Sequence, residues 1–501
     1  MSRTASRSRE RSNRRSARSA VASAHPLSTA AGLEVLEAGG NAFDAALAVS
    51  AALPVVQPHM NGLGGDFFAV VHDGPPWAIN ASGPAGARAS RDHFLRAGRT
   101  RIPDRGPLSA ITVPGMVAAW PILLERSVLR WKQILDPAIR LASRGFPASP
   151  SLARAVASAG WADPDFQSVY SRVRSGALLR QPGLARTLRA ISLDSGHGFY
   201  HGELARAICR DLRRKGGLLE PSDFAAYVPD VGPPLKVRYR EYTVHTNRPP
   251  SQGATALIWL NLLSRSELSS MTERSFMGRL VRTMYTAYQY RSRYIGDPRL
   301  VHFPARLLRR TAVYERRRRW AAPAPTKSDT TAFSVFDGEV GISAIQSNYM
   351  GFGSGVSIRG TGINLNNRGC YFTLAPGHPN ELAPRKRTFH TLMATVATGP
   401  RMVLLGSMGG DVQPQVNVQV LCRHLDRGLS LADAIRAPRF AYPASIYGSA
   451  PLYREAGAKV EGARPLRNDR SMFGHAQGIS VGEEVEVGVD PRGDGLLPLP
   501  S

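Results

Sequence analysis

A short stretch beginning at Asp329-Thr330-Thr331 constrains the fold of this 501-residue chain more than any other. Apolar and small polar residues alternate over 332–336 and again over 340–345, and Asp337-Gly338 lies between the two runs. Alternation of this kind predicts strands, and Asp-Gly between two such runs is typical of a two-residue hairpin turn. The sequence therefore predicts a β-hairpin that opens on the Asp-Thr-Thr tripeptide.

The predicted register brings two hydroxyl groups together. With the turn centred on 337 and 338, Thr330 faces Ile345, and Ser347 is the diagonal neighbour of Thr330 on the same face. Diagonal neighbours lie roughly 7–8 Å apart, and their side chains come closer. A hydroxyl nucleophile needs a supporting group of this kind. For this segment taken alone, a purely structural hairpin with Thr at a strand edge is the alternative interpretation.

The length and composition fit a large folded protein. The chain could form about three average domains or one large sandwich, and its 43% hydrophobic residues suffice for a core. It contains no run of 18 or more apolar residues, so we expect no membrane-spanning helix. Cys209, Cys370 and Cys422 are too widely spaced for a disulfide framework or a metal site. No cluster of His or carboxylate residues indicates a metal, and we expect no cofactor.

A formal charge of +26 is unusual for an enzyme, and two Arg-rich blocks carry part of it. Residues 3–18 hold seven Arg, and Arg309, Arg310 and Arg316 to Arg319 form the second block. Such blocks could contact nucleic acid or a membrane surface. No nucleic-acid-binding module follows, however, and no aromatic residues are interleaved with the Arg runs. We therefore favour a solvated basic surface over nucleic-acid binding.

The first 23 residues are predicted to be a disordered tail, because their Arg- and Ser-rich composition is too polar to bury. They lack the apolar stretch that a secretory signal requires. We expect a cytoplasmic protein, with export as the alternative, and folded structure from about Ala24.

The rest of the chain divides into runs of helices and runs of strands. Asn41 is a typical helix N-cap with Asp44 in the first turn, and Pro54 is predicted to end that helix. The Gly-rich segment 58–66 precedes a strand, so it is neither a P-loop nor a dinucleotide-binding loop. Segregated runs of helices and strands favour an α+β layered fold. Further helices are expected at 29–38, over much of 115–224 and at 275–290, an exposed linker at 323–327, and strands at 67–72, 235–239, 242–246, 341–345 and 402–405.

Several motifs taken together resemble the gamma-glutamyltranspeptidase family of N-terminal nucleophile hydrolases. The similarity spans roughly residues 22–495, and Asp329-Thr330-Thr331 falls where members of the family cut their own chain. The combination, rather than any single motif, makes the resemblance specific. The other matching segments include Ala24-His25-Pro26-Leu27, Gly39-Gly40-Asn41-Ala42, Pro58-His59-Met60, Gly62-Leu63-Gly64-Gly65-Asp66, Val113-Pro114-Gly115, Gly145-Phe146-Pro147, Gly351-Phe352-Gly353-Ser354-Gly355, Asn366-Asn367, Gly409-Gly410 and Ala437-Pro438-Arg439-Phe440.

The resemblance implies a four-layer αββα sandwich and a precursor that cleaves the peptide bond between Asp329 and Thr330. The products would be a large subunit, residues 24–329, and a small subunit, residues 330–501, which stay together as a heterodimer and one composite domain. The other expected partners are a small amide, similar to glutathione or another acyl amide, and water or an amine acceptor.

A free α-amine on Thr330 explains how such a cleavage would create a catalyst. A Thr hydroxyl is a poor nucleophile near neutral pH, and an amine with a pKa near 8 on the same residue can take its proton. By resemblance, Ser347 assists Thr330, and the backbone N–H groups of Gly409 and Gly410 form the oxyanion hole. Glycine also suits the close approach of a substrate, because it has no Cβ. A structural Ser and a plain Gly-Gly turn are the alternatives.

The substrate-binding positions depart from those of gamma-glutamyl transferases. The family binds the substrate carboxylate with Arg in an Arg-Glu-x-Ala-Pro segment, which corresponds here to Asn80-Ala81-Ser82-Gly83-Pro84. Tyr371 replaces the Asp that binds the substrate amine, and His390-Thr391 replaces a Ser-Ser pair. Loss of one charge-assisted contact weakens binding by about 1.5–3 kcal/mol. A γ-glutamyl group would therefore lose contacts at both of its charged ends.

Segments 346–352 and 386–391 are similar instead to the acylase-like branch of the family, which includes relatives of the glutaryl-cephalosporin acylases. Our hypothesis is that Arg368 binds an acidic end of the acyl group, and the alternative is that it joins the solvated basic surface. Tyr349 and His390-Thr391 are predicted to line the pocket by position alone.

The sequence thus predicts a self-processing amide hydrolase or acyltransferase, similar to glutathione hydrolases, that moves a γ-glutamyl or similar acyl group to water or an amine through an acyl-enzyme on Thr330. One alternative is an acylase for glutaryl-type or other non-glutamyl amides. An alternative of another class is an unprocessed, inactive basic binding protein.

Overall fold

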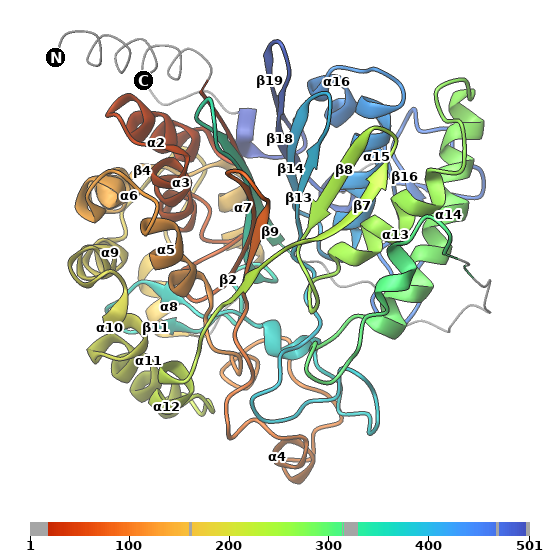
Figure 1. Ribbon diagram of the computed structural model, residues 1–501. Coiled ribbons are helices and arrows are strands. Elements are labelled where there is room, and N and C mark those ends of the chain that lie inside the picture. Colours follow the sequence, from red (N-terminus) through yellow and green to blue (C-terminus); the bar gives the residue numbers. More distant parts are fainter. Residues whose placement is uncertain (1–18, 160–162, 313, 315–328, 467–469, 497–501) are drawn as a thin grey trace, which may run out of the picture.

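The computed structural model describes residues 19–159, 163–312, 314, 329–466 and 470–496. Two antiparallel sheets of six strands each lie face to face, and helices cover the outer side of each sheet (Figure 1). This four-layer αββα arrangement confirms the predicted fold class. The Arg316–Arg319 block, the predicted 323–327 linker and residues 1–18 of the tail lie outside the described residues.

The first sheet has the Asp329 hairpin near its centre. Its strands lie in the order β1, β9, β10, β2, β3, β6, and each pairs antiparallel with its neighbour. Both β9 and β10 are buried on both faces, by helices on one side and by the second sheet on the other. The bounds are β1 Ala20–Ser23, β2 Asp66–His72, β3 Trp77–Ala81, β6 Asp230–Gly232, β9 Asp329–Phe336 and β10 Gly341–Tyr349.

The hairpin exists, but its predicted register was wrong. Phe336 pairs with Gly341, so the connection is the four-residue loop 337–340 and not a two-residue turn. The carboxylate of Asp337 accepts hydrogen bonds from the N–H groups of Glu339 and Val340, which stabilises the longer loop. The strands are consequently shifted by two residues, and Ile345 pairs with Ala332 instead of Thr330.

The second sheet joins strands from distant parts of the chain. Its order is β19, β18, β14, β13, β8, β7. The strands predicted at 235–239 and 242–246 are its β7 and β8, and the strand predicted at 402–405 is the main part of β14. The bounds are β7 Leu235–Tyr239, β8 Tyr242–Thr246, β13 Ala394–Thr398, β14 Met402–Ser407, β18 Ala476–Val481 and β19 Val485–Val489.

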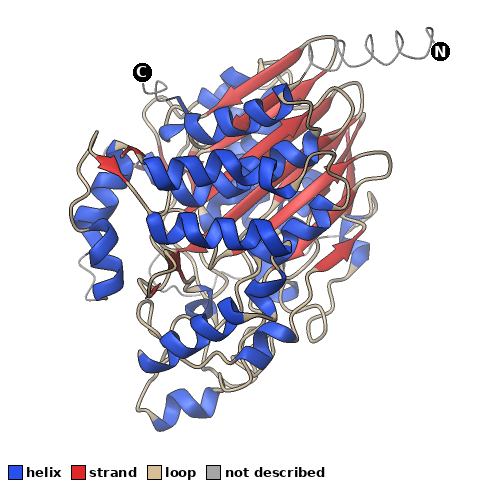
Figure 2. Cartoon of the chain, turned by 90° about the vertical axis from the view of Figure 1, so that its left-hand side faces the viewer, coloured by secondary structure: helices blue, strands red, loops and turns tan. Residues whose placement is uncertain are grey.

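Helices from the first half of the chain cover the first sheet. Figure 2 shows them stacked in front of the strands. Helices occupy much of 115–224, as predicted, and the helix expected at 29–38 begins at Pro26. The bounds are α2 Pro26–Glu37, α3 Ala42–Val56, α5 Met116–Leu124, α6 Trp131–Arg144, α7 Pro150–Ala159, α8 Pro164–Tyr170, α9 Pro182–Asp194, α10 His197–Tyr200, α11 Glu203–Arg214 and α12 Pro221–Ala225, with α4 Arg91–Arg96 at the foot of the molecule in Figure 1.

The second sheet is covered by α13 Gly253–Leu263, α14 Glu273–Tyr294, α15 Gln413–Leu425 and α16 Leu431–Arg436 (Figure 1). The helix expected at 275–290 is therefore longer by a turn at its end. Short strands and 3-10 turns complete the described chain: β4 Phe146–Pro147, β5 Leu178–Leu179, β11 Ser357–Ile358, β12 Ile363–Asn364, β15 Phe440–Ala441, β16 Tyr453–Arg454, β17 Arg464–Pro465, η1 Ala305–Leu308, η2 Arg368–Tyr371, η3 Gly410–Val412, η4 Arg470–Phe473 and η5 Asp494–Leu496.

Helix α3 does not end at Pro54, contrary to the prediction. Proline has no N–H, so the carbonyl of Ser50 loses its partner one turn earlier in the helix. The side-chain amide of Gln346, on β10, donates to that carbonyl at 3.0 Å. Every residue of α3 is buried, so this replacement bond forms in the core, and the helix continues to Val56.

Folded structure begins earlier than Ala24, because Ala20–Ser23 forms β1 and pairs with β9, so these four residues are no part of a disordered tail. No helix in the described ranges is long and apolar enough to cross a membrane. The three cysteines are free thiols.

Candidate active site

Thr330 lies at the start of β9 with its side chain between the two sheets. Residues two apart on a strand share a face, and Thr330 shares its face with Ala332. A Cβ added to Gly406 of β14 would lie 2.8 Å from the Cβ of Ala332 of β9, so β9 and β14 pack closely at this point. Thr330 itself is 1% exposed. Its hydroxyl is therefore held in the layer where the sheets meet.

A relay of hydrogen bonds joins Thr330 to the carbonyl group of the residue before it. Thr330 Oγ1 donates to Ser347 Oγ at 3.2 Å, and Ser347 Oγ donates to the carbonyl oxygen of Asp329 at 2.7 Å. Ser347 also accepts from the N–H of Tyr349 at 2.7 Å, which fixes the direction of its single proton. The structure thus brings together Thr330 and Ser347, although by a different register from the predicted one.

An irregularity in β10 makes this relay possible. Pairing with β9 is regular as far as Gln346 and resumes, shifted, at Tyr349. Tyr349 has a φ of +81°, an uncommon conformation for a side chain of its size. The bulge directs the Ser347 hydroxyl toward the Asp329–Thr330 peptide bond, and such bulges are common beside active sites.

Gly409 and Gly410 follow β14 at the Thr330 end of the sheets. Along β14, Met402 lies beside Gly341 and Gly406 lies beside Ala332, so the strand runs toward the beginning of β9. Gly409 has φ +134° and Gly410 has φ +53°, values that L side chains rarely adopt. Within the described ranges, neither N–H group donates to a protein acceptor. The turn therefore offers two donors at the end of the sheet interface, as an oxyanion hole requires.

Arg368 is buried, which rules out its place in a solvated basic surface. Its side chain is 1% exposed, and its guanidinium stacks 4.2 Å from the ring centre of Tyr349. Nη1 donates to Thr391 Oγ1 at 3.1 Å, and Nε lies 3.7 Å from the carboxylate of Asp66. Nε and Nη2 have no hydrogen-bond partner among the described residues. A buried guanidinium with unused donors is prepared for a ligand that carries acceptors.

His390 is tied to the same carboxylate. Its Nε2 lies 2.9 Å from Asp66 Oδ2, and its Nδ1 accepts from the N–H of Leu392 at 3.2 Å. Burial, reinforced by Arg368, lowers the pKa of His390 well below its ordinary value, so this imidazole is neutral and donates through Nε2. Burial also raises the pKa of Asp66 to about 7, against the opposing effect of Arg368. Asp66 is thus the group in this cluster whose charge changes near neutral pH.

A second buried carboxylate, that of Asp411, directly follows the Gly-Gly turn. Tyr371 donates to Asp411 Oδ1 at 2.8 Å, and Arg291 Nη1 donates to the same oxygen at 2.9 Å. Gln252 Nε2 donates to the carbonyl groups of Gly410 and Thr391, both at 2.7 Å. Gln252 therefore connects the Gly-Gly turn to the segment that holds Arg368.

Sequence reasoning missed Asp66, Asp411, Arg291 and Gln252. Two of them had a usable signal, because Asp66 ends the Gly-rich motif at the first residue of β2 and Asp411 follows Gly409-Gly410 directly. Arg291 lies within α14, where an Arg is ordinary. His25 and His59, which lie in segments that match the family, are both buried, and His25 caps α2. No group of three or more His, Cys, Asp or Glu in the described ranges is arranged to hold a metal.

Comparison with known proteins agrees with this architecture. The gamma-glutamyltranspeptidase family model matches residues 28–497. The chain is 36% identical to the glutathione hydrolase-like YwrD proenzyme of Bacillus subtilis. The alignment runs over 516 residues and covers 95% of this chain and 97% of that protein. It is 34% identical over 442 residues to the oxamate amidohydrolase proenzyme of Klebsiella pneumoniae, with 83% of each covered.

The crystal structure of cephalosporin acylase from Bacillus halodurans is similar over 95% of both chains, with a TM-score of 0.85 and 32% identity. The family match spans nearly the whole chain, and the curated relatives align over most of their own lengths. The chain is an enzyme that belongs to the gamma-glutamyltranspeptidase family.

Proposed function

We propose that this enzyme cleaves itself between Asp329 and Thr330 and then uses Thr330 as the nucleophile of an amide hydrolase for acyl groups that end in a carboxylate. The observation that carries the proposal is the buried relay from Thr330 through Ser347 to the Asp329 carbonyl oxygen. It connects the attacking oxygen and the attacked carbonyl group in the uncut chain.

Self-cleavage uses groups that already lie in contact. Thr330 Oγ attacks the carbonyl carbon of Asp329, and the proton from Oγ passes to the departing Thr330 nitrogen. The Ser347 hydroxyl donates to the carbonyl oxygen as negative charge develops there. The Asp329–Thr330 amide becomes an ester, which water hydrolyses. The products are the new carboxyl group of Asp329 and a Thr330 with both a free hydroxyl and a free amine.

Catalysis by the cut enzyme follows the same chemistry on an external amide. The Thr330 α-amine takes the proton from Oγ, and Oγ attacks the substrate carbonyl to form an ester. The N–H groups of Gly409 and Gly410 bind the oxyanion, and removing one such donor typically lowers the rate by about 10² to 10³. The leaving amine receives the proton, and water or an acceptor amine then attacks the ester and regenerates Thr330.

The charges around the pocket favour an acyl group with a free carboxylate and no ammonium group. Arg368 has unused donors in a buried position, where a carboxylate can take two of them. The carboxylate of Asp411, by contrast, is already bonded to Tyr371 and Arg291. A γ-glutamyl group, which carries an ammonium as well, is therefore the second candidate. Two of the similar proteins, the oxamate amidohydrolase and the cephalosporin acylase, also bear names of non-glutamyl substrates.

Two measurements test the proposed function. N-terminal sequencing of the purified protein should find a fragment that begins Thr-Thr-Ala-Phe-Ser. A single intact chain with no hydrolase activity would instead support the inactive binding protein. Hydrolysis of a glutaryl, a γ-glutamyl and a butyryl anilide should then rank the glutaryl substrate first by kcat/KM.

The Arg368→Ala variant tests the acyl specificity itself. We expect kcat/KM to fall by about 10- to 150-fold for the glutaryl anilide, because a charge-assisted hydrogen bond contributes about 1.5–3 kcal/mol. The uncharged butyryl anilide is the matched control, and its kcat/KM should change by less than threefold. Equal losses for both substrates would contradict a role for Arg368 in reading charge.

A further inference from the structure

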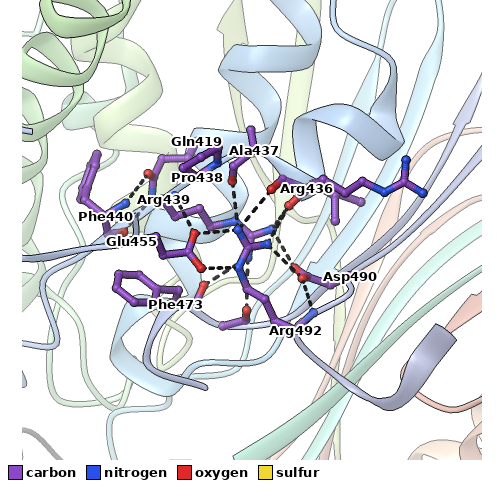
Figure 3. A network of polar contacts seen from close by, with 12 residues as sticks. Gln419, Arg436, Ala437, Pro438, Arg439, Phe440, Glu455, Phe473, Asp490 and Arg492 are labelled. Carbon is purple, nitrogen blue, oxygen red and sulfur yellow. Dashed lines mark hydrogen bonds and ion pairs between the residues drawn. The ribbon is translucent and has the colours of Figure 1, made fainter. Parts of the chain in front are cut away.

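A buried ion-pair network surrounds Arg439 and Asp490 (Figure 3). Arg439 is 1% exposed and Asp490 is fully buried, and Arg439 Nη2 lies 2.7 Å from Asp490 Oδ2. Arg492 contacts both oxygens of Glu455 at 2.6 Å and Asp490 Oδ1 at 3.0 Å. Burial alone would raise the pKa of Asp490, but Arg439 and Arg492 outweigh it and hold that pKa below its ordinary value.

The pair holds one short segment of backbone at both ends. Arg439 Nη1 donates to the carbonyl oxygens of Phe473 and Gly474 at 3.1 and 3.2 Å. Asp490 Oδ2 accepts from the N–H of Ala476 at 2.9 Å. The guanidinium and the carboxylate thus fix residues 473–476 through three hydrogen bonds to their backbone. A planar guanidinium can make all of these bonds in one fixed geometry, which a lysine ammonium cannot.

Residues 473–476 in turn support the turn that contains Gly409 and Gly410. His475 accepts, through its carbonyl oxygen, from the N–H of Met408 at 2.8 Å. A Cβ on Gly474 would lie 2.5 Å from the carbonyl oxygen of Met408, and a Cβ on Gly409 would lie 3.4 Å from Gly474 Cα. The two backbones are therefore in direct contact, with no side chain between them.

We infer that Arg439 and Asp490 are positioning residues for the oxyanion hole: they hold residues 473–476 against Met408–Gly410 and so fix the direction of the Gly409 and Gly410 N–H groups. A turn of two glycines has little conformational preference of its own, so neighbouring backbone must hold it. This inference rests on the proposed function, in which those two N–H groups bind the oxyanion. Small errors in the placement of such groups have large effects on rate, about 10²-fold for 1 Å.

The Arg439→Lys variant tests the inference, with Arg240→Lys as its matched control. Arg240 likewise forms an ion pair, with Asp426 at 2.7 Å, although its side chain is only part-buried. It also donates to two backbone carbonyls, those of Ser264 and Ser266. It has no hydrogen bond to residues 408–410 or 473–476 in the described chain. Both variants keep a positive charge and lose the guanidinium fork.

Pre-steady-state acylation of cleaved enzyme by a glutaryl anilide separates positioning from stability. In Arg439→Lys we expect the acylation rate constant to fall by about 10- to 100-fold while the burst amplitude per mole of free Thr330 amine is unchanged. General destabilisation would lower the amplitude and not the rate constant. The control variant should keep the wild-type rate constant within twofold. An unchanged rate constant in Arg439→Lys, or an equal fall in the control, overturns the inference.

Amide hydrogen exchange gives a readout that does not depend on activity. Exchange in the peptide that contains Met408–Gly410 should become at least 10-fold faster in Arg439→Lys and stay unchanged in Arg240→Lys. If wild-type enzyme hydrolyses none of the acyl anilides, the proposed function fails, and the exchange experiment still decides whether the network holds the turn. Should Arg439→Lys not fold, Asp490→Asn takes its place, with the same expected direction in both measurements.

Discussion

At the scale of single residues, the binding of an anionic acyl group by Arg368 is expected to depend on whether Asp66 is charged. Below pH 7 the carboxyl group is protonated, since burial raises its pKa to about 7, and the charge of Arg368 is then free to bind an anionic acyl group. As the pH rises through 7, Asp66 ionises 3.7 Å from Arg368 and competes with the substrate. We expect the ratio of kcat/KM for glutaryl over butyryl anilide to fall by about 5- to 20-fold between pH 5.5 and 8.5, or about 1–2 kcal/mol.

In this ratio the effect of Thr330 amine titration on kcat/KM cancels, because that amine acts on both substrates equally. His390 stays neutral throughout this range, because burial lowers its pKa well below the ordinary value. Asp66→Asn is the test variant: its ratio should be independent of pH and close to the acid limit of the wild type. A wild-type profile that persists in Asp66→Asn would assign the titration to another group.

The sequence predicted part of this site. Alternation around Asp337-Gly338 predicted the hairpin, and Thr330 does lie near Ser347, although the register differs by two residues from the predicted one. The family motif pointed to Gly409-Gly410. The pairing of Asp66 with Arg368 and His390 was not predictable. It joins the start of a strand, a 3-10 turn and a loop, and more than 300 residues of chain separate Asp66 from His390. Burial of a charged residue depends on tertiary packing, and local patterns carry no signal for it.

At the scale of elements, helix α3 and strand β10 complete each other. The Ser50 carbonyl, left without a helical partner by Pro54, accepts instead from Gln346. Sequence rules predicted the end of the helix at Pro54 because they describe a helix in isolation, and the partner lies 296 residues further along the chain.

A double-mutant cycle tests this contact. Gln346→Ala should lower the free energy of unfolding by about 1–3 kcal/mol, since it leaves buried groups unpaired. In a Pro54→Ala background, where the helix regains its own N–H donor, the loss should be smaller by about 0.5–1.5 kcal/mol. The losses are measured by urea unfolding of proteins that all carry Thr330→Ala as well. Equal losses in the two backgrounds would show that Gln346 acts only through its other partners.

At the scale of the whole molecule, the two fragments made by the proposed cut share both sheets. In the first sheet, β9 and β10 of the small fragment lie between β1 and β2 of the large fragment. In the second sheet, β13 of the small fragment pairs with β8 of the large one. Separation of the fragments would break backbone pairing in both sheets and expose the core between them.

We therefore expect cleaved enzyme to elute as one species in size-exclusion chromatography under native conditions and to separate into two fragments only in denaturant. Thr330→Ala should stay uncut and inactive, and its Tm should lie within about 5 °C of the cleaved protein, because the strand pairing is the same in both. Free small fragment in native buffer, or a much lower Tm for the cleaved form, would mean that the covalent link at 329–330 is needed to keep the sheets together.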